Sequence, residues 1–105
     1  MRAVKINSKD RCIEEVEFDG LTSMQRHVGG LIEPIRIETP ELKDHEVLVD
    51  EEGICKDVAY GFLIKGGNQP YAGDGLVVGD TGENYVGTEI SKEEVEDLVE
   101  FFGYA

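Results

Sequence analysis

The hydrophobic residues of this chain occur in short runs that are separated by glycine. The segment Gly75-Leu76-Val77-Val78 is one of the longest runs, whereas a helix needs about 20 apolar residues to cross a bilayer. Thirteen of the 105 residues are glycine, and glycine is favoured where a backbone turns or where two backbones approach closely. We therefore expect a small, β-rich fold with many turns and no membrane-spanning segment.

Two pairs of segments have the pattern of β-hairpins. Residues 2–7 alternate between apolar and polar side chains, and residues 12–18 follow a polar turn with β-branched and aromatic residues. Residues 74–79 and 84–87 flank the turn at 80–83, in which a glycine suits a positive φ angle. The sequence therefore predicts four strands in two hairpins.

The middle of the chain predicts two further strands and a long loop. Residues 31–38 read as a strand, and Pro34, which has no N–H to donate, predicts that this strand lies at an edge or contains a bulge. Residues 45–50 are a second short strand segment. Residues 54–73 hold several aromatic side chains but are interrupted by glycines and a proline, so we expect a surface loop with buried anchors.

Two segments have helical periodicity. Residues 21–28 place apolar side chains three and four positions apart before a pair of glycines, which favours a helix of about two turns. Ser91 and Glu94 have the spacing of a capping box, which predicts the start of a second helix. Apolar side chains then recur at the spacing of one helix face as far as Gly103, at Val95, Leu98, Val99 and Phe102. The C-terminal helix is therefore expected to be the longer one.

The fold class follows from the order of these elements, which is strands, helix, strands, helix. This order is typical of an α+β fold, here a single small domain over residues 1–105 with a mainly antiparallel or mixed sheet and two helices. A chain of 105 residues with 40% hydrophobic residues is long enough for one core and too short for two.

The charge and the cysteine count exclude several classes of function. Ten basic and 23 acidic side chains give a formal net charge of −13, which repels nucleic-acid phosphates and anionic lipid, so we expect no direct binding to nucleic acid or membrane. Residues 1–5 lack the apolar core of a signal peptide, and Cys12 and Cys55 are too few for a disulfide framework. A cytoplasmic location, in the cell of a host, is the expectation.

The residue types that usually carry chemistry form no recognisable motif. The candidate metal ligands lie 15, 18 and 10 residues apart, at Cys12, His27, His45 and Cys55, whereas structural zinc sites use close pairs. Neither a Walker sequence nor a nucleophile elbow occurs. We therefore expect no metal, no cofactor and no covalent catalysis. An enzyme of another type, with His27 or His45 as the acid–base group, stays an alternative.

Acidic side chains gather on the predicted C-terminal helix, opposite its apolar stripe, at Glu93, Glu96, Asp97 and Glu100. Like charges four positions apart cost an isolated helix about 0.2–0.5 kcal/mol per pair. A solvated acidic face is the ordinary interpretation. The sharper hypothesis is that this face imitates a row of phosphates and captures a nucleic-acid-binding protein.

A second candidate site lies in the glycine-rich region 61–79. Aromatic and amide side chains there could hold a small molecule, namely Tyr60, Phe62, Asn68 and Tyr71. The competing interpretation is that these glycines serve the turns and bulges of a small β-rich fold.

Several short motifs resemble one family of small domains. They are the Phe-Asp-Gly-Leu lead at 18–21, the Val-Gly-Gly-Leu-Ile-Glu join at 28–33, the Asp-Glu-Glu-Gly turn at 50–53, the Gly-Phe-Leu-Ile block at 61–64, the Val-Val-Gly-Asp end of a glycine-rich segment at 77–80 and the Ser-Lys-Glu-Glu helix start at 91–94. The resemblance runs from about Lys5 to Phe102, with a family of unknown function found largely in bacteriophages, plasmids and other mobile elements. It implies an α+β domain of mobile-element origin and supplies no catalytic residue. The segment 68–72 lacks the arginine that often occurs at this place in the family, so the resemblance assigns no role to a basic loop residue here.

Together these observations favour a non-enzymatic acidic binding protein of viral or mobile-element origin. It would modulate a host system as a counter-defence protein, by acting as a decoy for a basic host protein. The alternatives are a small-ligand-binding domain built on region 61–79, an enzyme of undetected type, and an acidic domain from a salt-rich host whose charge carries no information about partners.

Overall fold

The larger of two β-sheets, sheet A, forms the middle layer of the fold. The computed structural model describes residues 1–53 and 59–103. Sheet A is antiparallel throughout and consists of β1 (Arg2–Asn7), β2 (Cys12–Glu17), β3 (Ile32–Ile35), β4 (His45–Asp50), β7 (Gly75–Asp80) and β8 (Tyr85–Val86). The order across the sheet is β2-β1-β7-β4-β3, and β8 pairs with the end of β7.

The two predicted hairpins are confirmed. Strands β1 and β2 pair over their full length, from Arg2 opposite Glu17 to Asn7 opposite Cys12, and β7 pairs with β8 beyond a turn in which Gly82 has a φ of 91°. The predicted edge position of Pro34 is also correct, because β3 pairs only with β4 among the described strands. Strand β3 is shorter than the eight residues expected.

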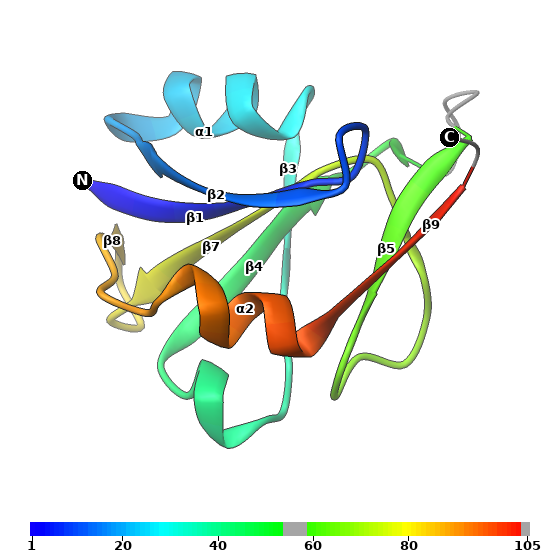
Figure 1. Ribbon diagram of the computed structural model, residues 1–105. Coiled ribbons are helices and arrows are strands. Elements are labelled where there is room, and N and C mark those ends of the chain that lie inside the picture. Colours follow the sequence, from blue (N-terminus) through cyan, green and yellow to red (C-terminus); the bar gives the residue numbers. More distant parts are fainter. Residues whose placement is uncertain (54–58, 104–105) are drawn as a thin grey trace.

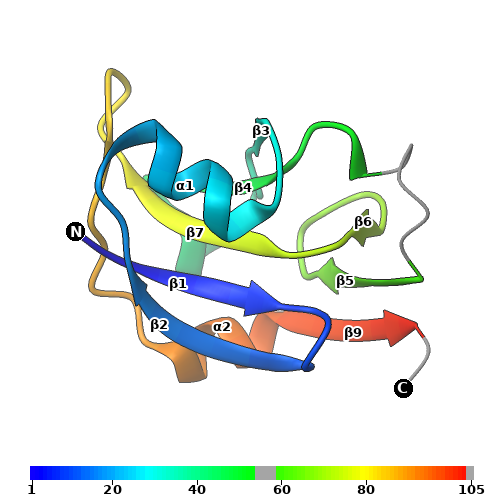
Figure 2. The same ribbon diagram turned by 90° about the horizontal axis from the view of Figure 1, so that it is seen from above.

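One helix covers one face of sheet A, and the second helix, a short 3-10 turn and the second sheet cover the other (Figures 1 and 2). Helix α1 (Gly20–Val28) packs over β7, β4 and β3 and ends at Gly29, whose φ is 94°. The opposite face is covered by α2 (Lys92–Leu98), the 3-10 turn η1 (Pro40–Leu42) and sheet B, which consists of β5 (Tyr60–Ile64), β6 (Tyr71–Ala72) and β9 (Val99–Gly103).

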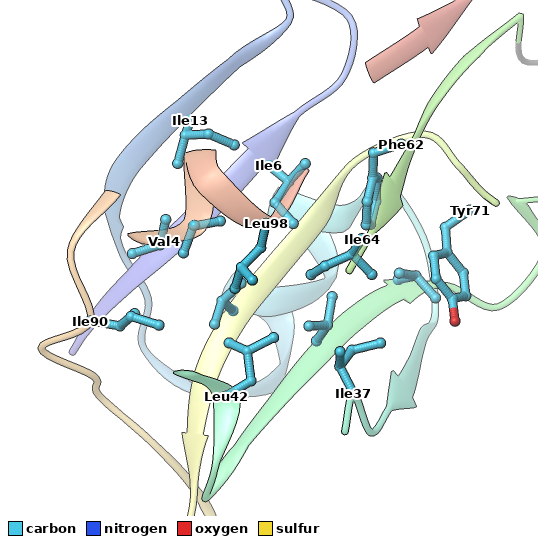
Figure 3. Close-up of a cluster of buried hydrophobic side chains, with 14 residues drawn as sticks. Val4, Ile6, Ile13, Ile37, Leu42, Phe62, Ile64, Tyr71, Ile90 and Leu98 are labelled. Atoms are coloured by element: carbon cyan, nitrogen blue, oxygen red, sulfur yellow. The ribbon is translucent and has the colours of Figure 1, made fainter. Parts of the chain in front are cut away.

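Side-chain alternation along the strands produces two clusters of buried residues, one on each face of sheet A. Leu48 and Leu76 point toward α1, while Val47 and Val77 point toward α2 and sheet B. The second cluster is the larger, and Figure 3 shows Phe62 and Ile64 of β5 entering it beside side chains from sheet A. The side chains of β5 therefore pack sheet B against the rest of the fold.

The predicted extent of the C-terminal helix is wrong. Helix α2 has seven residues and α1 has nine, and the chain becomes extended at Val99, where φ is −110° and ψ is 138°. Residues 99–103 form β9, which pairs with β5 from Val99 opposite Ile64 to Gly103 opposite Tyr60. Pairing with a distant strand overrides the helical spacing of the local sequence, because it satisfies the backbone hydrogen bonds of a segment rich in aromatic and β-branched residues.

The expectation of a surface loop over residues 54–73 is wrong for seven of its 15 described residues. Residues 54–58, which include Cys55, lie outside the described residues. Strands β5 and β6 occupy 60–64 and 71–72. The ring of Phe62 packs so closely on Gly75 of β7 that a Cβ atom added there would lie 2.8 Å from the ring Cζ. Gly75 therefore permits the two sheets to approach.

The α+β class, with a mainly antiparallel sheet and two helices in one small domain, is confirmed. Among the described residues no helix is both long enough and apolar enough to cross a bilayer.

Candidate functional site

The start of α2 fixes the direction of its acidic side chains. The Ser91 Oγ atom accepts a hydrogen bond of 3.0 Å from the backbone N–H of Glu94, as the capping-box spacing predicts, and its hydroxyl lies 3.2 Å from Glu94 Oε1. Val95 and Leu98 are buried against sheet A. The helix period therefore leaves Glu93, Glu96 and Asp97 exposed on the opposite side.

The fourth predicted acidic residue, Glu100, does not belong to the helix. It lies on β9, where its side chain is exposed. Asp97 and Glu100 nevertheless line the same surface hollow at the junction of α2 and sheet B, together with Leu63. We refer to the three exposed residues Glu93, Asp97 and Glu100 as the acidic surface.

Glu96 lies in different surroundings from the other three acidic residues. It lines a separate hollow between the β1–β2 hairpin and α2, and two basic side chains, Arg11 and Lys92, line that hollow as well. The structure therefore brings Asp97 and Glu100 to one hollow and places Glu96 in another, which two basic side chains also line. Glu93 is exposed one helical turn before Asp97.

The carboxylates of the acidic surface form no ion pair with a described residue, although Lys65 lines the same hollow as Asp97 and Glu100. The ion pairs formed by the described residues involve other carboxylates, those of Glu15, Glu17, Glu46, Asp74 and Asp80. Within residues 1–53 and 59–103, no basic group lies within ion-pair distance of Glu93, Asp97 or Glu100. Their negative potential is therefore directed at the solvent.

The four predicted ligand-binding residues do not surround a common cavity. Phe62 is completely buried and Tyr71 nearly so, and their ring centroids lie 5.6 Å apart within the core (Figure 3). Tyr60 is half-buried at the start of β5, and Asn68 is exposed in the loop between β5 and β6. Two of the four residues therefore serve the packing of sheet B.

The hollow beside Tyr71 is small. Its volume is about 40 Å³, and Asp50, Gln69 and Pro70 also line it, whereas pockets for organic ligands measure about 300–1,000 Å³. Burial, and then the charge of Glu33, raise the pKa of the Tyr71 phenol, so this hydroxyl stays protonated at neutral pH. The hollow has room for about one water molecule.

Both histidines hold backbone segments in place. The His27 ring is 2.8 Å from the carbonyl oxygen of Glu17. The His45 ring is hydrogen-bonded to the carbonyl oxygen of Lys43 at 2.8 Å and to Thr88 Oγ1 at 2.6 Å. These contacts connect α1 to β2 and the start of β4 to the segment before α2.

Cys12 is the cysteine that the structure describes, and it is half-buried near the tip of the β1–β2 hairpin. Burial, followed by the nearby charges of Glu14 and Asp10, raises the pKa of its thiol, although Lys92 acts in the opposite direction. A thiol with a raised pKa is a weak nucleophile at neutral pH. Among the described residues no group of three or more histidine, cysteine or acidic side chains is placed to hold a metal ion.

Two exposed apolar residues lie next to the acidic surface, and the helical spacing of the sequence does not indicate them. Leu63 on β5 and Phe102 on β9 retain 39% and 37% of their possible exposure. The sequence predicts a loop position for Leu63 and a place in the buried stripe of a helix for Phe102. The alternation of Val99 and Phe101 with Glu100 and Phe102 is a strand signal that would place Phe102 on the same face as Glu100.

A charged cluster that the sequence does not predict joins two strands of sheet A and the segment that follows β3. Arg36 Nη2 lies 3.2 Å from Glu46 Oε1 and 3.1 Å from Asp80 Oδ2. Burial and a hydrogen bond with Asp80 raise the pKa of the Glu46 carboxyl, against the opposing effect of Arg36. The arrangement links the segment after β3 to β4 and β7, which is a structural role.

Comparison with known proteins is consistent with the predicted type of family. A family model described as a domain of unknown function, DUF3846, matches residues 1–103. No curated protein and no solved structure matches the chain. Because the family match covers almost all of the sequence, the chain belongs to the family of domains of unknown function DUF3846.

Proposed function

We propose that this chain is a non-enzymatic binding protein that captures a basic, nucleic-acid-binding protein through its acidic surface. The observation that carries this proposal is the grouping of Glu93, Asp97 and Glu100, all exposed and none in an ion pair with a described residue. Two of these carboxylates line the same hollow, although one comes from a helix and the other from a strand.

The physical basis of capture is competition for the charge of the partner. A protein that binds nucleic acid presents arginine and lysine side chains to a row of phosphates. An acidic surface on a chain of net charge −13 attracts the same side chains and accelerates the encounter. The chain would then occupy the surface that nucleic acid normally uses, and so act as a decoy.

The proposed setting is a virus or mobile element that acts on a host system, with the chain as a counter-defence protein in the host cytoplasm. This part of the proposal is supported by the motif resemblance at 28–33 and 61–64 and by the small size and acidity of the chain. In this setting the partner is a basic host protein that binds DNA or RNA.

Affinity capture from host lysate with two variants of equal charge tests the proposal. The site variant carries Glu93→Lys, Asp97→Lys and Glu100→Lys. The control variant carries Glu38→Lys, Glu83→Lys and Glu89→Lys, which change exposed residues that form no ion pair with a described residue. Each set raises the formal net charge by six, from −13 to −7.

The native chain and the control variant should both retain a basic nucleic-acid-binding protein, identified by mass spectrometry, and the site variant should not. Excess duplex DNA or RNA should release the retained protein, because the decoy and the nucleic acid compete for one surface. Equal retention by the site and control variants, or retention of a partner that nucleic acid fails to release, would contradict the proposal.

A further inference from the structure

Exposed apolar side chains lie directly beside the acidic surface. Leu63 and Phe102 are exposed by 39% and 37%, whereas Phe62 and Ile64, which flank Leu63 in the sequence, are buried. Side chains alternate between the two faces of a strand, so Leu63 and Phe102 lie on the outer face of sheet B, away from the core. Figure 2 shows that β5 and β9 extend together beyond the end of sheet A.

The Phe102 ring packs closely on the backbone of β5 at Gly61. A Cβ atom added to Gly61, the register partner of Phe102, would lie 2.7 Å from the ring Cζ atom and would overlap the carbonyl oxygen of Tyr71. The ring therefore rests over a position where β5 has no side chain. This contact holds Phe102 in place on the surface while more than a third of the residue stays accessible.

The hollow between α2 and sheet B combines an apolar lining with charged groups. Its volume is about 290 Å³, its apolar lining includes Leu63, Leu98 and Val99, and its charged residues are Asp97, Glu100 and Lys65. Arginine and lysine have long apolar stems that pack on such a lining while their charged ends reach a carboxylate. Because its two carboxylates outnumber the one ammonium group of Lys65, the hollow is complementary in charge and in polarity to a basic side chain.

The negative charge of this surface determines which kind of molecule can bind to it. A second copy of the chain placed face to face here would bring Asp97 and Glu100 against the same carboxylates, and like charges at a close contact are repulsive. Nucleic acid is repelled for the same reason. A protein segment that carries both basic and apolar side chains satisfies the acidic residues and covers Leu63 and Phe102.

We propose that Leu63 and Phe102 are the apolar centre of the partner-binding surface, and that the adjacent hollow accepts an arginine or lysine side chain of the bound protein. This inference rests on the proposed function, which it extends from charge attraction to a defined contact. An apolar centre bordered by charged residues is the usual composition of a protein interface, and the centre usually supplies most of the binding energy.

A peptide library displayed on phage tests this inference without knowledge of the natural partner. Selection of random peptides on the immobilised native chain should enrich sequences that place arginine or lysine next to an aromatic or aliphatic residue. Synthetic copies of these peptides are then tested for binding to a double variant of the chain that carries Leu63→Thr and Phe102→Thr. The matched control is Leu21→Thr with Leu31→Thr, which changes two leucines that are each 55% exposed elsewhere on the surface.

The Leu63→Thr, Phe102→Thr variant should bind the peptides about thirtyfold more weakly than the native chain, the loss expected for a residue at the centre of an interface. The control variant should bind them as the native chain does. Cooperative urea unfolding of both variants verifies that they are folded, and if the double threonine variant unfolds, Leu63→Thr and Phe102→Thr are measured singly. Unchanged affinity in the folded Leu63 and Phe102 variants would overturn the inference.

The outcomes separate this inference from the proposed function. Basic peptides that bind the native chain, fail to bind the Glu93→Lys, Asp97→Lys, Glu100→Lys variant and tolerate changes of Leu63 and Phe102 would overturn the inference alone. Enriched peptides that lack basic residues, or a failure to enrich any peptide over the charge-reversed variant, would overturn both.

Discussion

Leu63 on β5 and Glu100 on β9 are register partners, and both side chains are exposed on the outer face of sheet B. This pairing joins residues 37 positions apart in the sequence. It places an apolar and an acidic side chain next to each other at the surface, where the carboxylate of Asp97 borders the same hollow. A protein interface needs both kinds of group in one place.

The contact between Gly61 and Phe102 predicts that Gly61→Ala is strongly destabilising. The new methyl group would overlap the carbonyl oxygen of Tyr71, so β5 and β6 must separate. We expect a loss of about 1–3 kcal/mol or more in the free energy of unfolding, measured by urea denaturation. Gly87→Ala is the control, because its methyl group meets its nearest atoms at 3.4 Å. An equal effect of the two substitutions would show that β5 and β6 are not in close contact at Gly61.

Phe62 is buried and Asn68 is exposed, which predicts that Phe62 contributes to the stability of the fold and that Asn68 does not. Phe62 is completely buried between β5 and β7, so Phe62→Ala should lower the free energy of unfolding by about 3–5 kcal/mol. Asn68→Ala changes an exposed loop residue and should stay within about 0.5 kcal/mol of the native chain. A native-like unfolding midpoint for Phe62→Ala would instead support an exposed, ligand-binding position for this ring.

The cap at the start of α2 predicts a defined cost for its removal. Ser91→Ala deletes the oxygen that accepts from the N–H of Glu94, which should cost about 0.5–2 kcal/mol of stability. Ser91→Asp keeps an acceptor at this position and should retain most of the stability. If the alanine and aspartate variants melt at the same temperature, the cap does not contribute to folding.

The cluster of Arg36, Glu46 and Asp80 predicts a pH-dependent effect. Because burial and Asp80 raise the folded-state pKa of Glu46, the folded protein holds this proton more tightly than the unfolded chain does. The contribution of Glu46 to stability is therefore full below the ordinary glutamate pKa, about 4.3, and is lost as the pH rises through the folded-state pKa.

Glu46→Gln removes this titration. The difference in the free energy of unfolding between Glu46→Gln and the native chain should shift in favour of the variant as the pH rises from about 4 to about 7. Urea denaturation at a series of pH values measures it. A constant difference over this range, or a shift in favour of the native chain, would contradict the raised pKa.

Local sequence is sufficient to predict most of the fold. The β1–β2 and β7–β8 hairpins, α1 with its stop at Gly29, and the cap at Ser91 all depend on neighbouring residues, and the structure confirms all of them. Residues 99–102 fit two patterns, since Val99 and Phe102 extend a helical stripe while Val99 and Phe101 alternate with Glu100 and Phe102. The choice depends on β5, about 40 positions away in the sequence, and no local pattern contains that information.

The same dependence limits the prediction of the surface. The acidic residues on α2 can be identified from the sequence because their exposure follows from the helix period and from burial of Val95 and Leu98. The exposure of Leu63 and Phe102 depends on which face of sheet B meets the core, and this is decided by the pairing of β5 with β9 and by the packing of Phe62 on Gly75.

The most direct test of partner capture by the acidic surface is to map where a basic partner binds. Amide chemical shifts of the isotopically labelled native chain are recorded during titration with the nucleic-acid-binding protein retained in the capture experiment. We expect the largest changes at residues 93–102 and at Leu63, and we expect the Glu93→Lys, Asp97→Lys, Glu100→Lys variant not to show them. Changes concentrated on α1 and the face of sheet A that it covers, with residues 93–102 unaffected, would contradict capture by this surface.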